Sequence, residues 1–264
     1  MSDFIGTKLT MNLGERSYDI ILKNGALENL YQFARLDRKV AVVTDSGVPA
    51  QYAQRVADQC RDAVIITVPQ GEASKSFKIL ETVLKQMLDF HMGRGDLVVA
   101  VGGGVVGDLA GFAASIYMRG IDFINCPTTT LSMIDSSIGG KTAVDLGDTK
   151  NIVGAFWQPK LVIVDPDTLA TLPRRHYING LAEAVKASLL ADPELFAIFE
   201  KGDIDGQINE IIYRSLRFKK NIVEQDETEH GMRKALNFGH TIGHGIEAVK
   251  GIKGRRTVGL FHGE

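Results

Sequence analysis

Apolar positions in the first two thirds of the chain come in short, uninterrupted runs rich in Val and Ile. These runs cover residues 39–45, 63–68, 96–101, 121–126 and 161–165, and turn residues bound each of them. Strands that are buried on both faces show no alternation of apolar and polar positions, which is the pattern of a parallel sheet. We therefore expect these five runs to form a parallel sheet.

The segments between these runs carry other periodicities. Residues 8–22 alternate in places and break at 12–15, which predicts a β-hairpin. Residues 76–90 place apolar side chains at helical spacing, and residues 49–60 do so more weakly. Strands that alternate with helices predict an α/β fold with a doubly wound, Rossmann-like sheet.

The pattern changes after residue 165, where strand-like runs stop and helical periodicity replaces them. We expect a domain boundary near residue 172, with an NAD-binding α/β domain over 1–172 and an α-helical metal- and substrate-binding domain over 173–264. Helices are expected in the second domain at residues 174–190, 193–201, 207–223 and 237–250.

Composition narrows the class of protein. The chain has 264 residues, 44% hydrophobic and 23% charged, as in ordinary globular proteins. The net charge of -2 gives no electrostatic basis for binding nucleic acid, and no apolar run approaches the length of a membrane span. The N-terminus has no signal-peptide pattern, and Cys60 and Cys126 are too few for a disulfide framework, so we expect a cytoplasmic protein. The 28 glycines are an excess that predicts tight turns and close approach of the backbone to a ligand.

One glycine cluster directly follows the expected strand 96–101. Gly102, Gly104 and Gly107 fit the spacing of a dinucleotide-binding turn, in which a helix N-terminus meets a pyrophosphate. The cluster follows a middle strand, whereas the fingerprint ordinarily follows the first. A dinucleotide site and a plain strand-to-helix turn therefore both stay open.

A second cluster ends in Gly140-Lys141-Thr142, which resembles the tail of a phosphate-binding P-loop. The P-loop requires a glycine five residues before Gly140, and Asp135 stands there, so the ATP-binding interpretation fails. Lys141 and Lys150 beside glycine turns suit an anionic ligand, because ammonium groups bind phosphate or carboxylate as point charges.

Acidic and histidine side chains raise the question of a metal. Glu183 and Lys186 stand three residues apart on an expected helix, which is ordinarily a surface ion pair. Glu183, His240 and His262 would nevertheless make a three-ligand zinc site with an open position, as in catalytic zinc centres.

A helix that reaches back to Arg233 would align Arg233, Asn237, His240 and His244 on one stripe. Two histidines four residues apart can bind one zinc, but no Glu follows His240 as the zincin pattern requires. The metal interpretation and a chance histidine pair both stay open. Solvated or core positions are expected for the histidines without an identifiable partner, which are His91, His176 and His230.

Taken together and in order, these motifs resemble the 3-dehydroquinate synthase family, the sugar-phosphate cyclases of the shikimate pathway. The likeness runs from near residue 18 to the last residue. The segments that carry it are 71–75, 102–108, 117–120, 127–130, 133–142, 150–151, 180–186, Lys219, 233–247 and 262–264.

The resemblance implies NAD and a divalent metal, zinc or cobalt, the metal held by Glu183, His240 and His262. The residues implied for NAD are Asp45, Glu72, Lys75, Gly103, Gly104, Asp108, Thr128, Thr129, Lys141, Lys150, Thr168 and Thr171. Those implied for substrate binding are Arg119, Asp135 and Asn151, and those for catalysis are Lys141, Lys186, Lys219, Arg233, Asn237 and His244, the last in an orienting role.

The implied substrate is the sugar phosphate 3-deoxy-D-arabino-heptulosonate 7-phosphate. Transient oxidation by NAD, phosphate elimination, reduction and aldol cyclisation would give 3-dehydroquinate, in a cytoplasmic homodimer. Three alternatives stay open: a cyclase of the valiolone or aminocyclitol type, a metal-dependent polyol dehydrogenase, and an inactive NAD-binding fragment. Because the family continues past His-Gly-Glu, we expect the helical domain to be truncated at its C-terminus.

Overall fold

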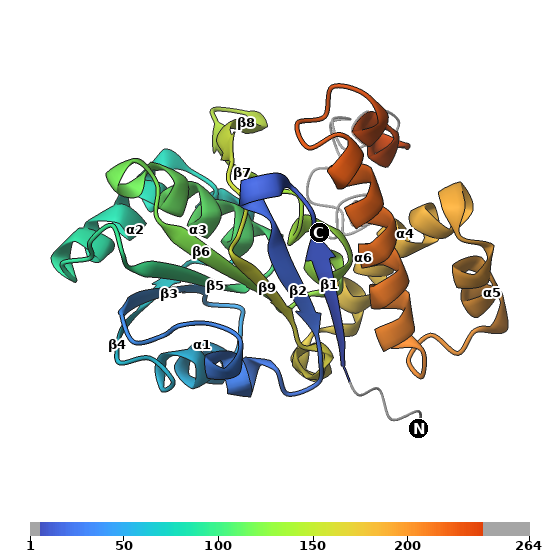
Figure 1. Ribbon diagram of the computed structural model, residues 1–264, viewed down its shortest axis with the longest axis horizontal. Coiled ribbons are helices and arrows are strands. Elements are labelled where there is room, and N and C mark those ends of the chain that lie inside the picture. The colour runs from blue at the N-terminus through green and yellow to red at the C-terminus, as the bar shows by residue number, and fades with distance from the viewer. Residues whose placement is uncertain (1–5, 240–264) are drawn as a thin grey trace.

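The computed structural model describes residues 6–239, and they form a seven-stranded sheet with helices on both faces (Figure 1). The strand order is β1-β2-β9-β6-β5-β3-β4, and every neighbouring pair is parallel except β1 with β2. The predicted hairpin and all five predicted strands are confirmed. The strands are β1 (Thr7–Met11), β2 (Tyr18–Leu22), β3 (Lys39–Asp45), β4 (Asp62–Val68), β5 (Leu97–Gly102), β6 (Asp122–Pro127) and β9 (Leu161–Val164).

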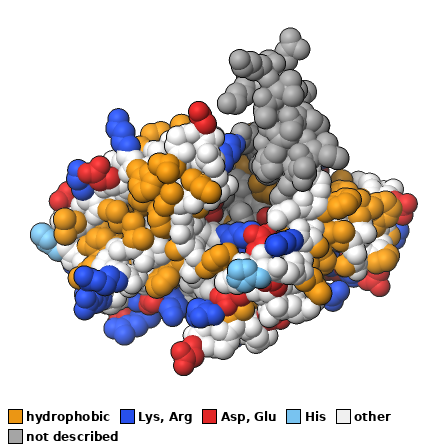
Figure 2. Space-filling view, turned by 90° about the horizontal axis from the view of Figure 1, so that it is seen from above, with side chains coloured by type: hydrophobic (Ala, Val, Ile, Leu, Met, Phe, Trp, Pro, Cys, Tyr) orange, Lys and Arg blue, Asp and Glu red, His pale blue; other side chains and the backbone are white. Residues whose placement is uncertain are grey.

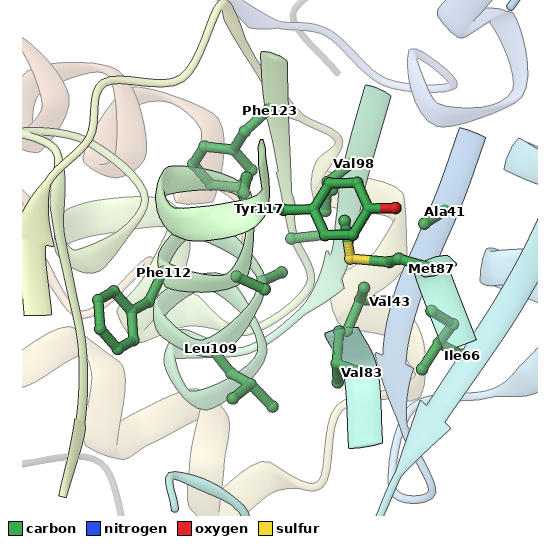
Figure 3. Close-up of a cluster of buried hydrophobic side chains, with 14 of the residues drawn as sticks. Ala41, Val43, Ile66, Val83, Met87, Val98, Leu109, Phe112, Tyr117 and Phe123 are labelled. Atoms are coloured by element: carbon green, nitrogen blue, oxygen red, sulfur yellow. The ribbon is translucent and has the colours of Figure 1, made fainter. Parts of the chain in front are cut away.

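The Val-rich strands have no polar positions in alternation because each face of the sheet packs against a layer of helices. In β3, Ala41 and Val43 join the core beneath α2 and α3, whereas Val40 and Val42 join the core around α1. Figure 3 shows the first of these cores, with Leu109 and Phe112 on α3 and with Val83 and Met87 of α2 beside Val43 of the sheet. The helices are α1 (Ala50–Ala57), α2 (Phe77–Asp89) and α3 (Gly104–Ile116).

Three helices follow the last strand and lie beside the β1–β2 end of the sheet (Figure 1). They bury Leu195 and Leu216 in one core with Met11 and Ile20 of the hairpin. The helices share this core with the sheet, and the division at residue 172 stays a prediction. They are α4 (Arg174–Ala191), α5 (Pro193–Lys201) and α6 (Ile208–Gln225).

Two polar links join the N-terminal hairpin to the end of α6. The side chain of Glu224 accepts hydrogen bonds from the backbone N–H and the side-chain amide of Asn12, at 2.6 and 2.7 Å. Arg16 pairs with Glu227 at 2.6 Å, and Glu227 also accepts a hydrogen bond from Gln158 at 3.0 Å. These contacts bring together segments more than 200 residues apart.

The structure differs from the predictions at two places. A second hairpin, β7 (Lys141–Leu146) and β8 (Thr149–Phe156), was not predicted, because β8 is mostly exposed and begins with three polar residues, so it lacks the continuous apolar run of a buried strand. A helix was expected over 237–250, and its extension back to Arg233 was left open; the structure has no α-helix between Arg233 and Gly239. A 3-10 helix covers Met232–Asn237, and then Phe238 turns to an extended conformation and Gly239 has a φ of +86°.

None of the helices between residues 6 and 239 combines the length and the apolar character that crossing a membrane would require.

Candidate active site

A cavity of about 1190 Å³ opens at the carboxyl ends of the parallel strands. The helices that follow β3 and β5 cover opposite faces of the sheet, so these neighbouring strands form a topological switch point, where α/β proteins bind ligands. Figure 2 shows this face hollowed, with side chains of both charges in the hollow. The volume exceeds that of a typical single-ligand pocket, which leaves room for a dinucleotide and a substrate together.

The wall between β5 and α3 is made of backbone. A Cβ on Gly103 would lie 3.1 Å from a Thr129 methyl carbon, and one on Gly104 would lie 3.0 Å from the Ser136 hydroxyl. No side chain caps the N-terminus of α3. The first turn of α3 therefore presents backbone N–H groups toward the cavity, as an anion site requires.

At the end of β3, the Asp45 carboxylate accepts hydrogen bonds from the N–H groups of Gly47 and Val48, at 2.7 and 3.2 Å. Burial raises the pKa of Asp45 above its ordinary value, and these two N–H donors oppose that shift. A buried acceptor at this strand end suits the hydroxyls of a ribose.

A buried lysine joins three elements of the cavity wall. Lys75 Nζ lies 2.6 Å from the carboxylate of Asp108 on α3 and 3.9 Å from Glu72, and it donates a hydrogen bond to the Asn151 side chain on β8. Burial raises the pKa of Asp108, although Lys75 opposes this shift. Lys75 thus links the β7–β8 hairpin to α3.

Lys219 and Asp135 form a buried pair at the other end of the cavity. Lys219 Nζ lies 2.7 Å from the Asp135 carboxylate and donates to its backbone carbonyl at 2.8 Å. Burial lowers the pKa of Lys219, against the pull of Asp135. Burial also acts to raise the pKa of Asp135, but the cations Lys219, Lys186 and Arg233 outweigh it and hold that pKa below its ordinary value.

Glu183 and Lys186 form the ion pair expected from their spacing, but both are largely buried and line the cavity. Lys186 Nζ also donates to the carbonyl of Leu236 at 2.5 Å. The carboxylate of Glu183 is a suitable ligand for a divalent metal. The other two predicted metal ligands, His240 and His262, lie outside the described residues.

Arg233 is 1% exposed and lies on the cavity wall. Its guanidinium donates to the carbonyl of Gly139 at 3.0 Å and to that of Glu227, and it lies 5.9 Å from the centre of the Phe156 ring. Among residues 6–239 it forms no ion pair with a carboxylate. The carboxylates of Glu229 and Asp135 act on its charge without forming an ion pair with it. A buried guanidinium whose hydrogen bonds go to neutral carbonyls favours an anionic ligand.

Glu229 is a site residue that the sequence did not reveal. Its carboxylate pairs with Lys141 and accepts a hydrogen bond from Asn237 Nδ2 at 3.0 Å, so it links two predicted catalytic residues. Burial acts to raise the pKa of Glu229, but these two donors outweigh it and lower that pKa. Its place four residues before Arg233, in an acidic turn, was the available signal.

All but two of the predicted site residues within the described range line the cavity. Thr168 is not on the wall, because it is buried with its hydroxyl donating to Asp165. Arg119 is also absent from the wall, because it follows the C-terminal end of α3 whereas the cavity lies at its N-terminal end. His244 lies outside the described residues. The predicted residues on the wall are Asp45, Glu72, Lys75, Gly103, Gly104, Asp108, Thr128, Thr129, Asp135, Lys141, Lys150, Asn151, Thr171, Glu183, Lys186, Lys219, Arg233 and Asn237.

The wall also includes residues assigned no role from the sequence. His176, for which a solvated or core position was expected, lies in the first turn of α4 and lines the cavity. Tyr52 of α1 lines the cavity and lies 2.9 Å from the Thr171 hydroxyl oxygen. Ser136 lines it from a π-helical turn over Ser132–Ser136.

The matches to protein families cover most of the chain. Residues 65–179 match the model of the 3-dehydroquinate synthase N-terminal domain, and residues 180–264 match that of the C-terminal domain. The chain is 44% identical to the 3-dehydroquinate synthase of Streptococcus thermophilus, over 97% of this chain and 74% of that protein. It is 41% identical to that of Pelobacter propionicus, over the same shares of the two chains.

Solved structures resemble the fold closely. A 2-deoxy-scyllo-inosose synthase complexed with carbaglucose-6-phosphate, NAD+ and Co2+ superposes with a TM-score of 0.84, at 26% identity over 96% of this chain and 71% of that one. The 2-epi-5-epi-valiolone synthase of Streptomyces hygroscopicus, with NAD+ and Zn2+ bound, gives 0.78 at 30% identity over 88% and 68%. A probable glycerol dehydrogenase from Sinorhizobium meliloti shares the fold, with a TM-score of 0.62 at 17% identity over 92% and 72%. With both family models matched along the chain, this protein belongs to the 3-dehydroquinate synthase family.

Proposed function

We propose that the chain converts 3-deoxy-D-arabino-heptulosonate 7-phosphate to 3-dehydroquinate and phosphate, with NAD and a divalent metal. The observation that carries the proposal is the composition of the cavity. One continuous space joins the uncapped N-terminus of α3 to a group of buried cations that includes Arg233. A dinucleotide and a small anionic substrate would meet there.

The end of the cavity at the N-terminus of α3 has room for a dinucleotide, because glycines line it. Side chains at Gly103 and Gly104 would fill the space in front of α3, and the glycines leave it open. Asp45 would accept hydrogen bonds from ribose hydroxyls, and the N–H groups of α3 would hold the pyrophosphate. When bound, NAD supplies a hydride acceptor that later returns the hydride.

The substrate end would hold two anionic groups of the heptulosonate phosphate. Arg233 is suited to the carboxylate, because a guanidinium presents donors in a fork that matches two carboxylate oxygens. Lys141 and Lys186 would bind phosphate oxygens, because ammonium groups bind anions as point charges. Both lysines pair with carboxylates, which hold their ammonium groups on the cavity wall.

The pKa directions assign proton roles within this end. The lowered pKa values of Asp135 and Glu229 keep both carboxylates ionised at neutral pH, so they hold cations and do not donate protons. The burial that lowers the pKa of Lys219 makes its ammonium a better proton donor than a solvated lysine. Lys219 is therefore the group suited to deliver a proton during the elimination and ring-opening steps.

The proposed metal would be held by Glu183, His240 and His262, and it would act as a Lewis acid on a substrate oxygen. A His240→Ala variant is expected to lose zinc or cobalt binding, measured by metal analysis after dialysis, while it keeps NAD binding. Full metal occupancy in this variant would refute the assignment.

The test of the function follows two products. Metal-loaded protein is mixed with NAD+ and the heptulosonate phosphate, and phosphate and 3-dehydroquinate are measured over time. Equal amounts of both, without accumulation of NADH, are expected. Protein that binds metal and NAD but releases no phosphate would contradict the proposal, and net NADH formed from a polyol would support the dehydrogenase alternative instead.

A related cyclase of the valiolone or inosose type is the second candidate, because two such enzymes match the fold. The substrates of these enzymes lack the carboxylate, and buried Arg233 favours a substrate that has one. A higher kcat/KM for a seven-carbon sugar 7-phosphate without a carboxylate would favour this candidate. The homodimer and the cytoplasmic location also stay predictions, and sedimentation analysis of the purified chain tests the first.

A further inference from the structure

One buried hydroxyl of the cavity has no function in the scheme above. The Ser136 Oγ is buried and has no hydrogen-bond partner among the residues that the structure describes. It belongs to a single π-helical turn, a rare conformation that is frequent at functional sites. A buried hydroxyl without a partner is costly, and of the unpaired hydroxyls among the described residues only this one lines the cavity, where a ligand could pair with it.

The surroundings of Ser136 show where that partner lies. A Cβ on Gly104 would come within 3.0 Å of the Ser136 oxygen, so the hydroxyl faces the backbone of the first turn of α3. Both residues line the cavity, and no side chain caps this helix. The preceding residue, Asp135, is already engaged with Lys219 and leaves the hydroxyl unpaired. The serine oxygen and the free N–H groups of α3 therefore face the same small volume.

We propose that the Ser136 hydroxyl donates a hydrogen bond to a pyrophosphate oxygen of NAD bound at the N-terminus of α3. This inference rests on the proposed function, because it takes NAD as the occupant. Phosphate chemistry at this position could also come from the substrate. The pyrophosphate is favoured because the hydroxyl faces Gly104, whereas the cations of the substrate end act on the carboxylate of Asp135.

The chain offers a matched control in the next residue. Ser137 has the same side chain, and its Oγ is also buried and without a partner among the described residues, but Ser137 does not line the cavity. Ser136→Ala and Ser137→Ala each remove one unpaired buried hydroxyl from adjacent positions. Only the first change removes a donor that could reach a ligand.

The experiment measures binding to the full chain by calorimetry, with NAD+ and with ADP-ribose, which keeps the pyrophosphate. Ser136→Ala is expected to raise both dissociation constants by roughly tenfold to a hundredfold, because a hydrogen bond to a charged group is lost. Ser137→Ala is expected to bind both ligands as the unchanged protein does. Adenosine, which has no phosphate, is measured by competition and should bind both variants equally.

Each other outcome counts against the inference. Unchanged binding of NAD+ by Ser136→Ala would overturn it while leaving the proposed function intact. If Ser136→Ala weakened the binding of adenosine as much as that of NAD+, the substitution would be shown to distort the pocket. That result would overturn the inference as well. Weaker competition by inorganic phosphate against the substrate, with ADP-ribose unaffected, would assign the hydroxyl to the substrate phosphate. Failure of the unchanged protein to bind NAD+ would refute the proposed function itself.

Discussion

Gly139 supports the position of Arg233 without lining the cavity. Its replacement by alanine combines backbone strain with displacement of the guanidinium, and a second glycine gives the strain alone. Gly139 has a φ of +95°, and an added Cβ would lie 2.5 Å from Arg233 Nη2 and 3.3 Å from a Val223 methyl carbon. An alanine in such a conformation costs roughly 1 kcal/mol. The guanidinium would also have to move by about 1 Å to reach an ordinary contact distance of ~3.5 Å.

That displacement breaks the hydrogen bond from Arg233 to the carbonyl of Gly139, which measures 3.0 Å. A hydrogen bond with a charged donor contributes about 2 kcal/mol, so Gly139→Ala is expected to lower the free energy of unfolding by about 3 kcal/mol. For a chain of this size that corresponds to a fall in Tm of about 6–12 °C. The KM for the heptulosonate phosphate should rise, because Arg233 would no longer meet the carboxylate, whereas NAD affinity should stay unchanged.

Gly147 is the control for backbone strain alone. It has a φ of +60° in the turn between β7 and β8, and an added Cβ would meet no atom within 4 Å. Gly147→Ala should therefore lower the free energy of unfolding by only about 1 kcal/mol, or about 2–4 °C in Tm. Differential scanning calorimetry of both variants gives the comparison. Equal Tm values, or an unchanged KM in Gly139→Ala, would refute the link between this glycine and the guanidinium.

Three further predictions test other parts of the structure. Lys219→Met should reduce turnover roughly a hundredfold or more, measured by phosphate release, whereas Lys220→Met, which changes a lysine off the cavity wall, should stay near the unchanged rate. Asp192 accepts the N–H bond that caps α5, and although burial acts to raise its pKa, that N–H and a guanidinium of α6 hold it below the ordinary value. The stabilisation by the Asp192 carboxylate is therefore present above about pH 4 and is lost as the pH falls further. Asp192→Ala should lower the free energy of unfolding, measured by urea denaturation, by about 1 kcal/mol at pH 7 and by less at pH 3. An equal loss at the two pH values would contradict this. Burial raises the pKa of Cys60 to about 11 and raises that of Cys126 further. A thiol reagent at pH 8 should therefore label Cys60 slowly and Cys126 only after unfolding. Fast labelling of Cys126 in the native state would count against its burial.

The strands were predictable because burial on both faces leaves a continuous apolar run, as in residues 96–101. The β7–β8 hairpin was missed for the opposite reason. Its second strand is mostly exposed and begins with three polar residues, and one partner that holds it is the distant Lys75, which no local pattern reveals.

The candidate site was predictable where a residue stands beside a glycine turn at a strand end, as Gly104 and Asp45 do. Arg119 follows the C-terminal end of α3, away from the described cavity wall, and its predicted role in substrate binding stays a prediction. Glu229 and Ser136 were missed because their roles depend on contacts with elements far away in the sequence. An α-helix that continues back to Arg233 is not formed, and at Gly239 the backbone takes a positive φ that glycine adopts readily.

The polar links between the first hairpin and the end of α6 constrain how the chain can be made. Asn12 meets Glu224 across 212 positions of sequence. A ribosome that adds about 5–20 residues per second needs roughly 10–40 s to cover that interval. A two-stranded hairpin is at best marginally stable by itself, and β2 must also await β9, which is synthesised late. The first hairpin therefore leaves the ribosome well before β9 and α6 are made, and until then the edge of β2 that pairs with β9 is open to chaperones.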